Sequence, residues 1–263
     1  MNRHSFLFWA VRAGMACLLV NMTSASAAEG PVYEMRTYVA APGKFDALLA
    51  RFRDHTCRLF EKHGIENIGY WIPLEEADGA NNTLVYMLRH KSRDAAKASF
   101  AAMGKDPEWQ KARAASEAGG KLLAQPPQSV FMTTTDYSPA VKAAKGDQER
   151  VFEMRTYNTP PGKLEALHER FRSHTMKLFS KHGMSHFGYW VPLDEEKGAG
   201  HKLVYILTHP SKEAGLAAFA TFRADPEWIK AKAASEEGGS LTLPQPEGVK
   251  SVYMRAADFS PTK

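Results

Sequence analysis

Two short runs of the chain place an acid, an arginine and a tyrosine at every second position: Glu34, Arg36, Tyr38 and Glu153, Arg155, Tyr157. Alternate residues of a β-strand share one face, so each trio would point in one direction. The arginine could hold an anionic group through two hydrogen bonds, and the tyrosine could donate a third. The runs therefore predict a site for a small polar ligand, with structural ion pairs as the alternative.

Two histidines and two tryptophans are further candidates. His55 and His174 stand at equivalent places in helical patterns, where they could act as general bases. Their apolar neighbours favour a hydrogen-bonded core histidine instead. Trp71 and Trp190 share strand parity with polar residues and could form an aromatic wall beside the ligand, with ordinary packing as the alternative.

Residue patterns that bind metals or cofactors are sparse. His55 and His63 lie eight residues apart, about 12 Å along a helix, which is too far for one ion. The sequence has no His-Glu-x-x-His motif and no acidic calcium loop. Cys57 is replaced by Met176 in the second copy described below, so no thiol chemistry is expected. We expect no metal and no bound cofactor, and haem ligation through His55 or His174 is the one option left open.

The chain is an internal duplication. The run Val-Tyr-Glu-Met-Arg-Thr-Tyr that starts at Val32 returns as Val-Phe-Glu-Met-Arg-Thr-Tyr at Val151. The same spacing holds along most of both copies, and the helix and strand patterns repeat with it. We expect a first domain over residues 31–139, a linker over 140–150 and a second domain over 151–261.

Each copy has the pattern of an α+β domain. In the first copy, β-branched and aromatic residues predict four strands, over residues 32–38, 65–73, 84–90 and 129–136. Helical spacing predicts a helix over residues 44–63, and Ser92 and Asp106 are expected N-caps of two more. The order is βαββαβ with an extra helix, which is the ferredoxin-like arrangement.

Such a unit covers one face of its sheet with helices and leaves the other face bare. Two units can cover their bare faces by packing them together, so we expect tandem ferredoxin-like domains that pair as one α/β barrel within the chain. We expect the apolar Tyr33 and Met35 to face the helices, and Glu34 and Arg36 to face the space between the sheets. The predicted ligand site therefore lies inside the barrel.

The N-terminus predicts export. Basic residues precede an apolar stretch at 13–20, and no acid occurs before Glu29. Small residues precede a cleavage site after Ala28, with Ala27 as the alternative. We predict a signal peptide over residues 1–28 and a secreted or periplasmic protein, and a mitochondrial presequence is the alternative.

The composition limits the classes of partner that the chain is expected to bind. The chain has 34 basic and 29 acidic residues, and loss of Arg3 and Arg12 with the signal leaves 32 against 29. No basic run or aromatic–basic interleaving favours nucleic acid, and no membrane contact is expected after signal cleavage. The expected partner is a small molecule, and a homo-oligomer is left open.

Several motifs together resemble the NIPSNAP family. In the first copy they are Tyr-Glu-Met-Arg-Thr-Tyr, Pro-Gly-Lys, Phe-Arg-x-His-Thr, Lys-His-Gly and Gly-Tyr-Trp-x-Pro, at residues 33–38, 42–44, 52–56, 62–64 and 69–73. The second copy matches them at residues 152–157, 161–163, 171–175, 181–183 and 188–192. The resemblance implies a dimeric α/β-barrel fold and no agreed enzymatic activity. Similar animal members are mitochondrial signals for organelle turnover, a role that the export signal argues against here.

These observations favour a secreted protein that binds a small polar molecule between its two sheets. In an enzymatic version, a cofactor-independent oxidoreductase or isomerase, Arg36 and Arg155 would hold a developing oxyanion and His55 or His174 would move protons. A non-enzymatic interaction or scaffold protein is the alternative.

Overall fold

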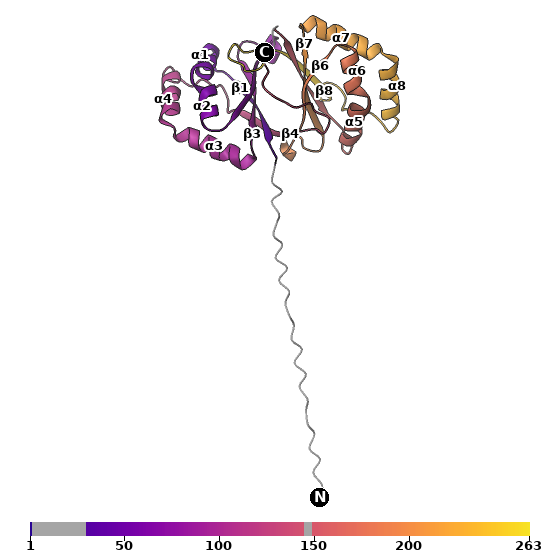
Figure 1. Ribbon diagram of the computed structural model, residues 1–263, viewed down its shortest axis with the longest axis horizontal. Coiled ribbons are helices and arrows are strands. Elements are labelled where there is room, and N and C mark those ends of the chain that lie inside the picture. The colour runs from indigo at the N-terminus through magenta and orange to yellow at the C-terminus, as the bar shows by residue number, and fades with distance from the viewer. Residues whose placement is uncertain (2–29, 145–148) are drawn as a thin grey trace.

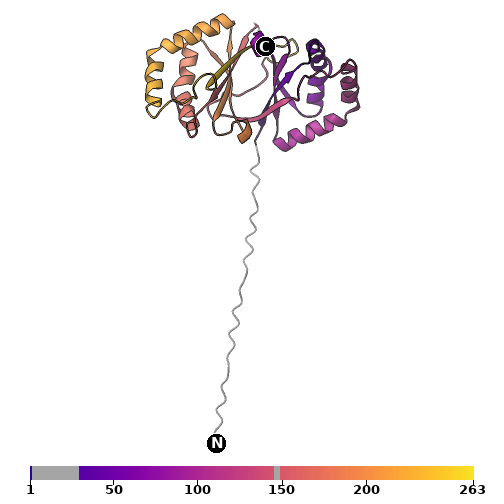
Figure 2. The same cartoon turned by 180° about the vertical axis from the view of Figure 1, so that it is seen from behind.

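The computed structural model describes Met1, residues 30–144 and residues 149–263. The predicted signal segment therefore lies almost entirely outside the described residues. Two similar halves stand side by side, with strands in the middle and helices on the two outer flanks (Figure 1). The same arrangement is seen from behind (Figure 2).

The two halves repeat one order of elements. The first half contains β1 (Val32–Val39), α1 (Phe45–Arg51), α2 (Cys57–Lys62), β2 (Glu66–Pro73), β3 (Thr83–His90), α3 (Arg93–Lys105), α4 (Pro107–Ser116) and β4 (Gln128–Thr134). The second contains β5 (Val151–Asn158), α5 (Leu164–Arg170), α6 (Met176–Lys181), β6 (Ser185–Pro192), β7 (Lys202–His209), α7 (Lys212–Ala224), α8 (Pro226–Ser235) and β8 (Val249–Ala256). This is the predicted order, and the helix expected over residues 44–63 contains a π-helical turn at Phe52–Thr56.

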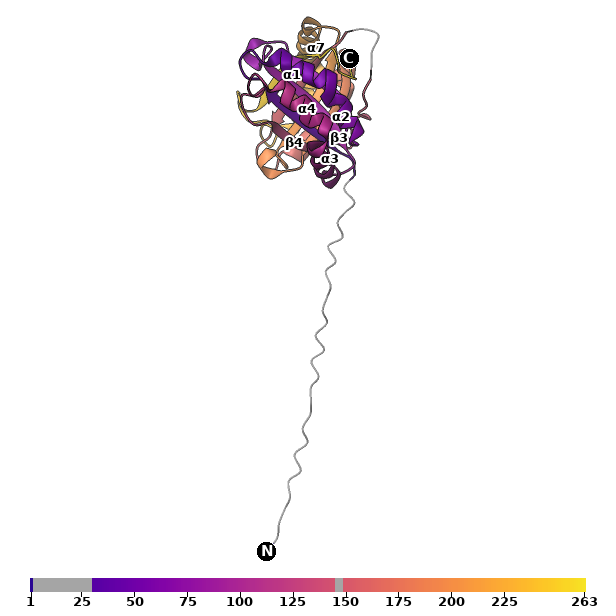
Figure 3. The ribbon, with the colours of Figure 1, turned by 90° about the vertical axis from the view of Figure 1, so that its left-hand side faces the viewer.

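Short polar side chains start the outer helices, as predicted. Ser92 accepts a hydrogen bond from the backbone N–H of Ala95, and Asp106 accepts one from that of Glu108. Each cap satisfies a donor that the first helical turn leaves free. The helices α1 to α4 lie over the outer face of the first half's sheet (Figure 3).

All strands in the described ranges pair into one closed barrel, in the order β1-β3-β2-β8-β5-β7-β6-β4. Within a half the ladders are long, and β1 pairs with β3 from Val32 to Val39. The two seams between the halves are shorter. One joins β2 to β8 from Trp71 to Pro73, and the other joins β4 to β6 from Met132 to Thr134. The predicted barrel of tandem ferredoxin-like domains is confirmed.

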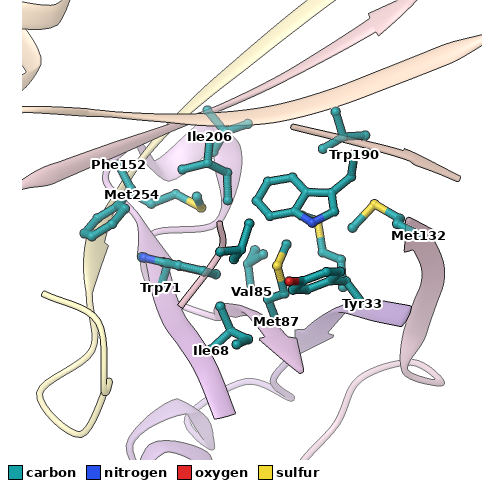
Figure 4. Packing of buried hydrophobic residues seen from close by; sticks show 14 residues of the cluster. Tyr33, Ile68, Trp71, Val85, Met87, Met132, Phe152, Trp190, Ile206 and Met254 are labelled. Carbon is teal, nitrogen blue, oxygen red and sulfur yellow. The ribbon is translucent and has the colours of Figure 1, made fainter. Parts of the chain in front are cut away.

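The barrel interior is apolar, so the prediction that it is lined by charged residues is wrong. Tyr33 and Met35 belong to a buried cluster that fills the space between the two halves, together with Trp71, Trp190 and other apolar residues (Figure 4). Glu34, Arg36 and Tyr38 point to the opposite face, beneath their own helices. The inner faces of both sheets are buried against each other, and unpaired charge there would lose its hydration without replacement.

A register shift in β2 also changes the predicted neighbours of the tryptophans. The pairing with β3 slips between Asn67 and Gly69, which reverses the alternation of faces along the strand. Asn67 consequently lies on the helix side, where its amide donates to the carbonyl of Cys57 at 2.9 Å. The inward-facing residues are Ile68 and Trp71. The equivalent shift in β6 lies between His186 and Gly188.

The ends of the two halves are exchanged. Phe259, just after β8, stacks on Phe52 and tilts against Tyr70 in the first half. Tyr137, just after β4, stacks in the same way on Phe171 of the second half. The expected linker contributes to the core as well, because Val141 is buried in the barrel cluster. These contacts hold the halves together where the strand seams are short.

The glycines of the register shifts give a test of this packing. A Cβ added at Gly188 would lie 2.5 Å from the ring of Trp190 and 2.7 Å from Val141. We expect Gly188→Ala to lower the free energy of unfolding by about 1–3 kcal/mol, because the ring must move within a closed core. Thermal and urea unfolding measure the change.

Gly104→Ala is the matched control, because a Cβ at Gly104 meets nothing within 4 Å. Equal stability of Gly188→Ala and the wild-type chain would contradict the packing described for the barrel interior.

Candidate functional site

Each half has a cavity between the outer face of its sheet and its helices. The first has a volume of about 320 Å³, and its walls include Arg36, Tyr38, Arg51, Phe100, Trp109 and Glu117. The second has a volume of about 520 Å³, and its walls include Arg155, Tyr157, Phe219, Phe222, Trp228 and Glu236. The predicted arginine and tyrosine of each trio therefore do line a cavity, but on the other side of the sheet from the one expected.

A buried carboxylate positions the arginine in each half. Arg36 Nη1 donates to Glu34 at 2.5 Å, and the same carboxylate accepts from Ser129 at 2.6 Å and from Nε2 of His90 at 3.0 Å. The Glu34 side chain is only 1% exposed. An ionised carboxylate can only accept hydrogen bonds, so its three donors fix both its position and that of the guanidinium.

The second half repeats this network. Glu153 accepts from Arg155 at 2.7 Å, from Ser251 at 2.6 Å and from His209 at 2.9 Å. The histidines and serines of the two networks were not identified from the sequence, although they lie at equivalent places in the two copies. Their pairing with the acids depends on how strands β3, β4, β7 and β8 lie beside β1 and β5.

Both carboxylates are held in the ionised form. Burial works to raise the pKa of Glu34, but the hydrogen bond from His90, the charge of Arg36 and the hydrogen bond from Ser129 together bring it below the ordinary value of 4.5. Burial is likewise outweighed at Glu153, whose pKa is lowered by His209, Arg155 and Ser251. Each arginine therefore has a fixed negative partner at neutral pH.

The guanidinium of each arginine lies against aromatic rings. Arg36 lies 5.0 Å from the ring centre of Phe100 and 5.6 Å from that of Tyr38. Arg155 lies 4.2 Å from the ring centre of Phe219. The Nε atoms of Arg36 and Arg155 are buried, and neither has a hydrogen-bond partner in the described part of the chain. Each cavity wall thus contains a cation whose donors are not all used.

A second arginine in each half, which the sequence did not reveal, contacts the tryptophan and the glutamate of the cavity wall, and in the first half it lines the cavity itself. Arg51 lies 5.4 Å from the ring centre of Trp109 and donates to Glu117 at 3.1 Å. Arg170 lies 5.1 Å from that of Trp228 and donates to Glu236 at 2.7 Å. The repeated Asp-Pro-Glu-Trp sequence was the available signal, because it places a tryptophan in the first turn of α4 and of α8.

The remaining predicted residues lie elsewhere. Trp71 and Trp190 face the barrel interior, as predicted, and are completely buried among apolar residues, away from both cavities. His55 is half-buried and His174 is exposed, so the favoured interpretation as core histidines is wrong. The buried positions of their π-helical turns are instead the preceding phenylalanine and the following threonine.

Neither histidine lies at the cavities beside Arg36 and Arg155. His55 does not line the cavity at Arg36, and His174 lines a separate surface cavity with Glu169, Arg170 and Ser173. Within residues 30–144 and 149–263, no group of three potential ligands is placed to hold a metal ion. Burial raises the pKa of the Cys57 thiol to about 12, so it is not a nucleophile at neutral pH.

The cavities offer cations, aromatic faces and hydroxyls, which suit a small anion with a planar or apolar body.

No helix among the described residues has the length and apolar character needed to span a bilayer.

The buried carboxylates predict how stability depends on pH. The folded-state pKa of Glu34 lies below the unfolded value, so its ionised form stabilises the fold above that value, and this contribution is lost as the pH falls through about 4.5 and below. We expect Glu34→Gln to lower the free energy of unfolding at pH 7 by roughly 3–5 kcal/mol, because Arg36 loses its charged partner. We also expect a weaker dependence on pH below 4.5, measured by urea unfolding.

Glu66→Gln is the control, since Glu66 forms an ion pair with Arg89 on the same sheet but is half exposed. A Glu34→Gln protein as stable as the wild type at pH 7 would show that the buried network contributes nothing.

Comparison with known proteins agrees with the architecture. A family model described as NIPSNAP matches residues 33–139 and 152–261. No curated protein matches the chain at a significant level. A crystal structure from Fusobacterium nucleatum, of a protein provisionally named a monooxygenase, covers 86% of this chain and 92% of its own, with 8% identity and a TM-score of 0.54.

A second structure with such a name, from Lactobacillus acidophilus, covers 87% of this chain and 94% of its own, with 10% identity and a TM-score of 0.53. A NIPSNAP family protein from Agrobacterium tumefaciens covers 41% of this chain and 97% of its own, with 20% identity and a TM-score of 0.36. At these identities the two longer structures share the fold alone. The family model covers almost all of both halves, and the chain belongs to the NIPSNAP family.

Proposed function

We propose that the protein binds small anionic molecules with a planar or apolar body, one in each half, in the cavities beside Arg36 and Arg155. The observation that carries this proposal is the repeated pair of mostly buried guanidinium groups, each stacked on an aromatic ring with a buried, unpartnered Nε atom. An anion would be held by the cation and its body by the rings.

The charge of the sites favours an anion over a cation. In the first half, the cations Arg36, Arg51 and Arg113 stand against the carboxylates of Glu34 and Glu117. One positive charge is therefore in excess around a mostly apolar cavity. A bound carboxylate would neutralise this excess at a place where water is largely displaced, which strengthens the attraction.

An enzymatic version, a cofactor-independent oxidoreductase or isomerase, is the second candidate. Arg36 Nη2 donates to the Tyr38 hydroxyl at 3.4 Å, and both residues line the cavity. Arg36 could therefore stabilise a developing oxyanion while Tyr38 donates the proton. His55 and His174 do not take part in this version. A scaffold protein without a ligand is the alternative that the experiment below distinguishes.

Titration with benzoate tests the binding proposal. We expect chemical shifts of backbone amides to change in α3 and α4 and, separately, in α7 and α8 of the isotope-labelled mature chain. Arg36→Gln should abolish the changes in the first half only, and Arg155→Gln those in the second half only, because each variant removes one anion partner. The two single variants therefore act as controls for each other.

Benzylamine, which has the same ring and the opposite charge, should produce neither set of changes. Circular dichroism shows whether the variants remain folded. Absence of benzoate binding to the wild-type chain would overturn the proposal. Unfolding of both variants, without benzoate binding to the wild type, would favour the scaffold alternative.

We also propose that the protein acts in the periplasm or outside the cell, on the basis of the N-terminal basic and apolar residues. Expression of the full chain in a Gram-negative host should give a periplasmic product whose mass corresponds to a chain starting at Glu29 or Ala28. A full-length product retained in the cytoplasm, or cleavage on import into isolated mitochondria, would contradict export.

A further inference from the structure

The two cavities differ at their mouths, although the halves are copies. Arg223 and Ile229 line the second cavity, and the equivalent positions in the first half, 119 residues earlier, are Gly104 and Gln110. Gly104 lines the first cavity. The second mouth therefore has an additional cation and an additional large apolar side chain. The second cavity is also the larger, at about 520 Å³ against about 320 Å³.

Both additional side chains are exposed. Ile229 is 55% exposed, although it is a large hydrophobic residue. Arg223 is exposed as well, and neither a hydrogen bond nor an ion pair joins it to the rest of the described chain. Single exposed apolar residues are ordinary. This one lines a cavity whose other walls include the rings of Phe219, Phe222 and Trp228.

The walls behind the entrance continue the apolar surface. Phe222 and Trp228 line the same cavity with ring centres 4.4 Å apart. In the first half Phe222 is replaced by the smaller and more flexible Met103. The second cavity thus has Phe222 and Ile229 where the first half has Met103 and Gln110, and it has two arginines, Arg155 and Arg223, among its lining residues.

We propose that the second-half cavity binds an amphipathic monoanion, a carboxylate on a flexible apolar chain, and that the first-half cavity does not. This rests on the proposed function, because Arg155 is the same anion partner. Arg155 and Arg223 hold the carboxylate, and the chain lies along Phe222, Trp228 and Ile229 towards the solvent. The apolar chain covers surface that is otherwise exposed, which supplies the additional affinity.

Exchanging residues between equivalent positions of the two halves gives matched variants for a test. Ile229→Gln introduces the residue found at Gln110, and Arg223→Gln removes the additional charge without placing a glycine in α7. In the reverse direction, Gly104→Arg with Gln110→Ile gives the first half both features. A Cβ added at Gly104 meets nothing within 4 Å, so the first atom of the new side chain has room.

The test is titration of the labelled chain with decanoate below its micelle concentration. We expect decanoate to change amide shifts in α7 and α8 but not in α3 and α4. Arg223→Gln with Ile229→Gln should weaken its binding at least about tenfold, since both a charged contact and apolar contact are lost. Benzoate binding in the first half should be unchanged. Gly104→Arg with Gln110→Ile should create decanoate binding in the first half.

Decyltrimethylammonium, which has the same chain and the opposite charge, should not bind. The inference is overturned if decanoate affects both halves of the wild-type chain alike, or if the second-half variant binds it as tightly as the wild type. In either case benzoate binding in both halves would leave the proposed function standing. Failure of benzoate to bind in either half would overturn the proposed function itself.

Discussion

The structure depends on one constraint, which is that the inner faces of both sheets must be apolar. The barrel closes through two short seams, and the space behind them is filled by a buried cluster that includes Trp71 and Trp190. Charged groups in this space would have no water and no partners. The polar face of each opening strand is therefore turned outward, and its acid and arginine lie beneath the helices.

On the helix side of the sheet, those charged groups find the partners that the barrel interior lacks. Glu34 finds three donors there, and Arg36 finds a carboxylate on one side and the ring of Phe100 on the other. A buried ion pair of this kind adds little stability compared with apolar packing, but it holds its members in fixed positions. Fixed position with unused donors is what a binding site for an anion requires.

Duplication within one chain allows two similar sites to differ. In a dimer of identical subunits, every substitution would change both cavities at once. Here Arg223 and Ile229 appear in one half, while the equivalent positions of the other half are Gly104 and Gln110. The networks of Glu34 and Glu153 remain the same in both. The buried part of the site is thus repeated, whereas the entrance is where the halves differ.

The sequence by itself determined the duplication, the order of elements, the helix caps at Ser92 and Asp106, and closure of two half-covered sheets into a barrel. These follow from local periodicity and from the need to cover a bare face. Strand parity also correctly grouped Glu34 with Arg36. Parity cannot say which of two faces is the inner one, and the trio was placed on the wrong side for that reason.

Only the tertiary structure showed that the slip at Gly69 reverses the alternation of faces along β2. It also showed that His90 and Ser129 donate hydrogen bonds to Glu34 and that Arg51 lies against Trp109. These contacts join residues from different strands and helices, so their distances depend on how the elements pack together and not on the spacing of residues along the chain.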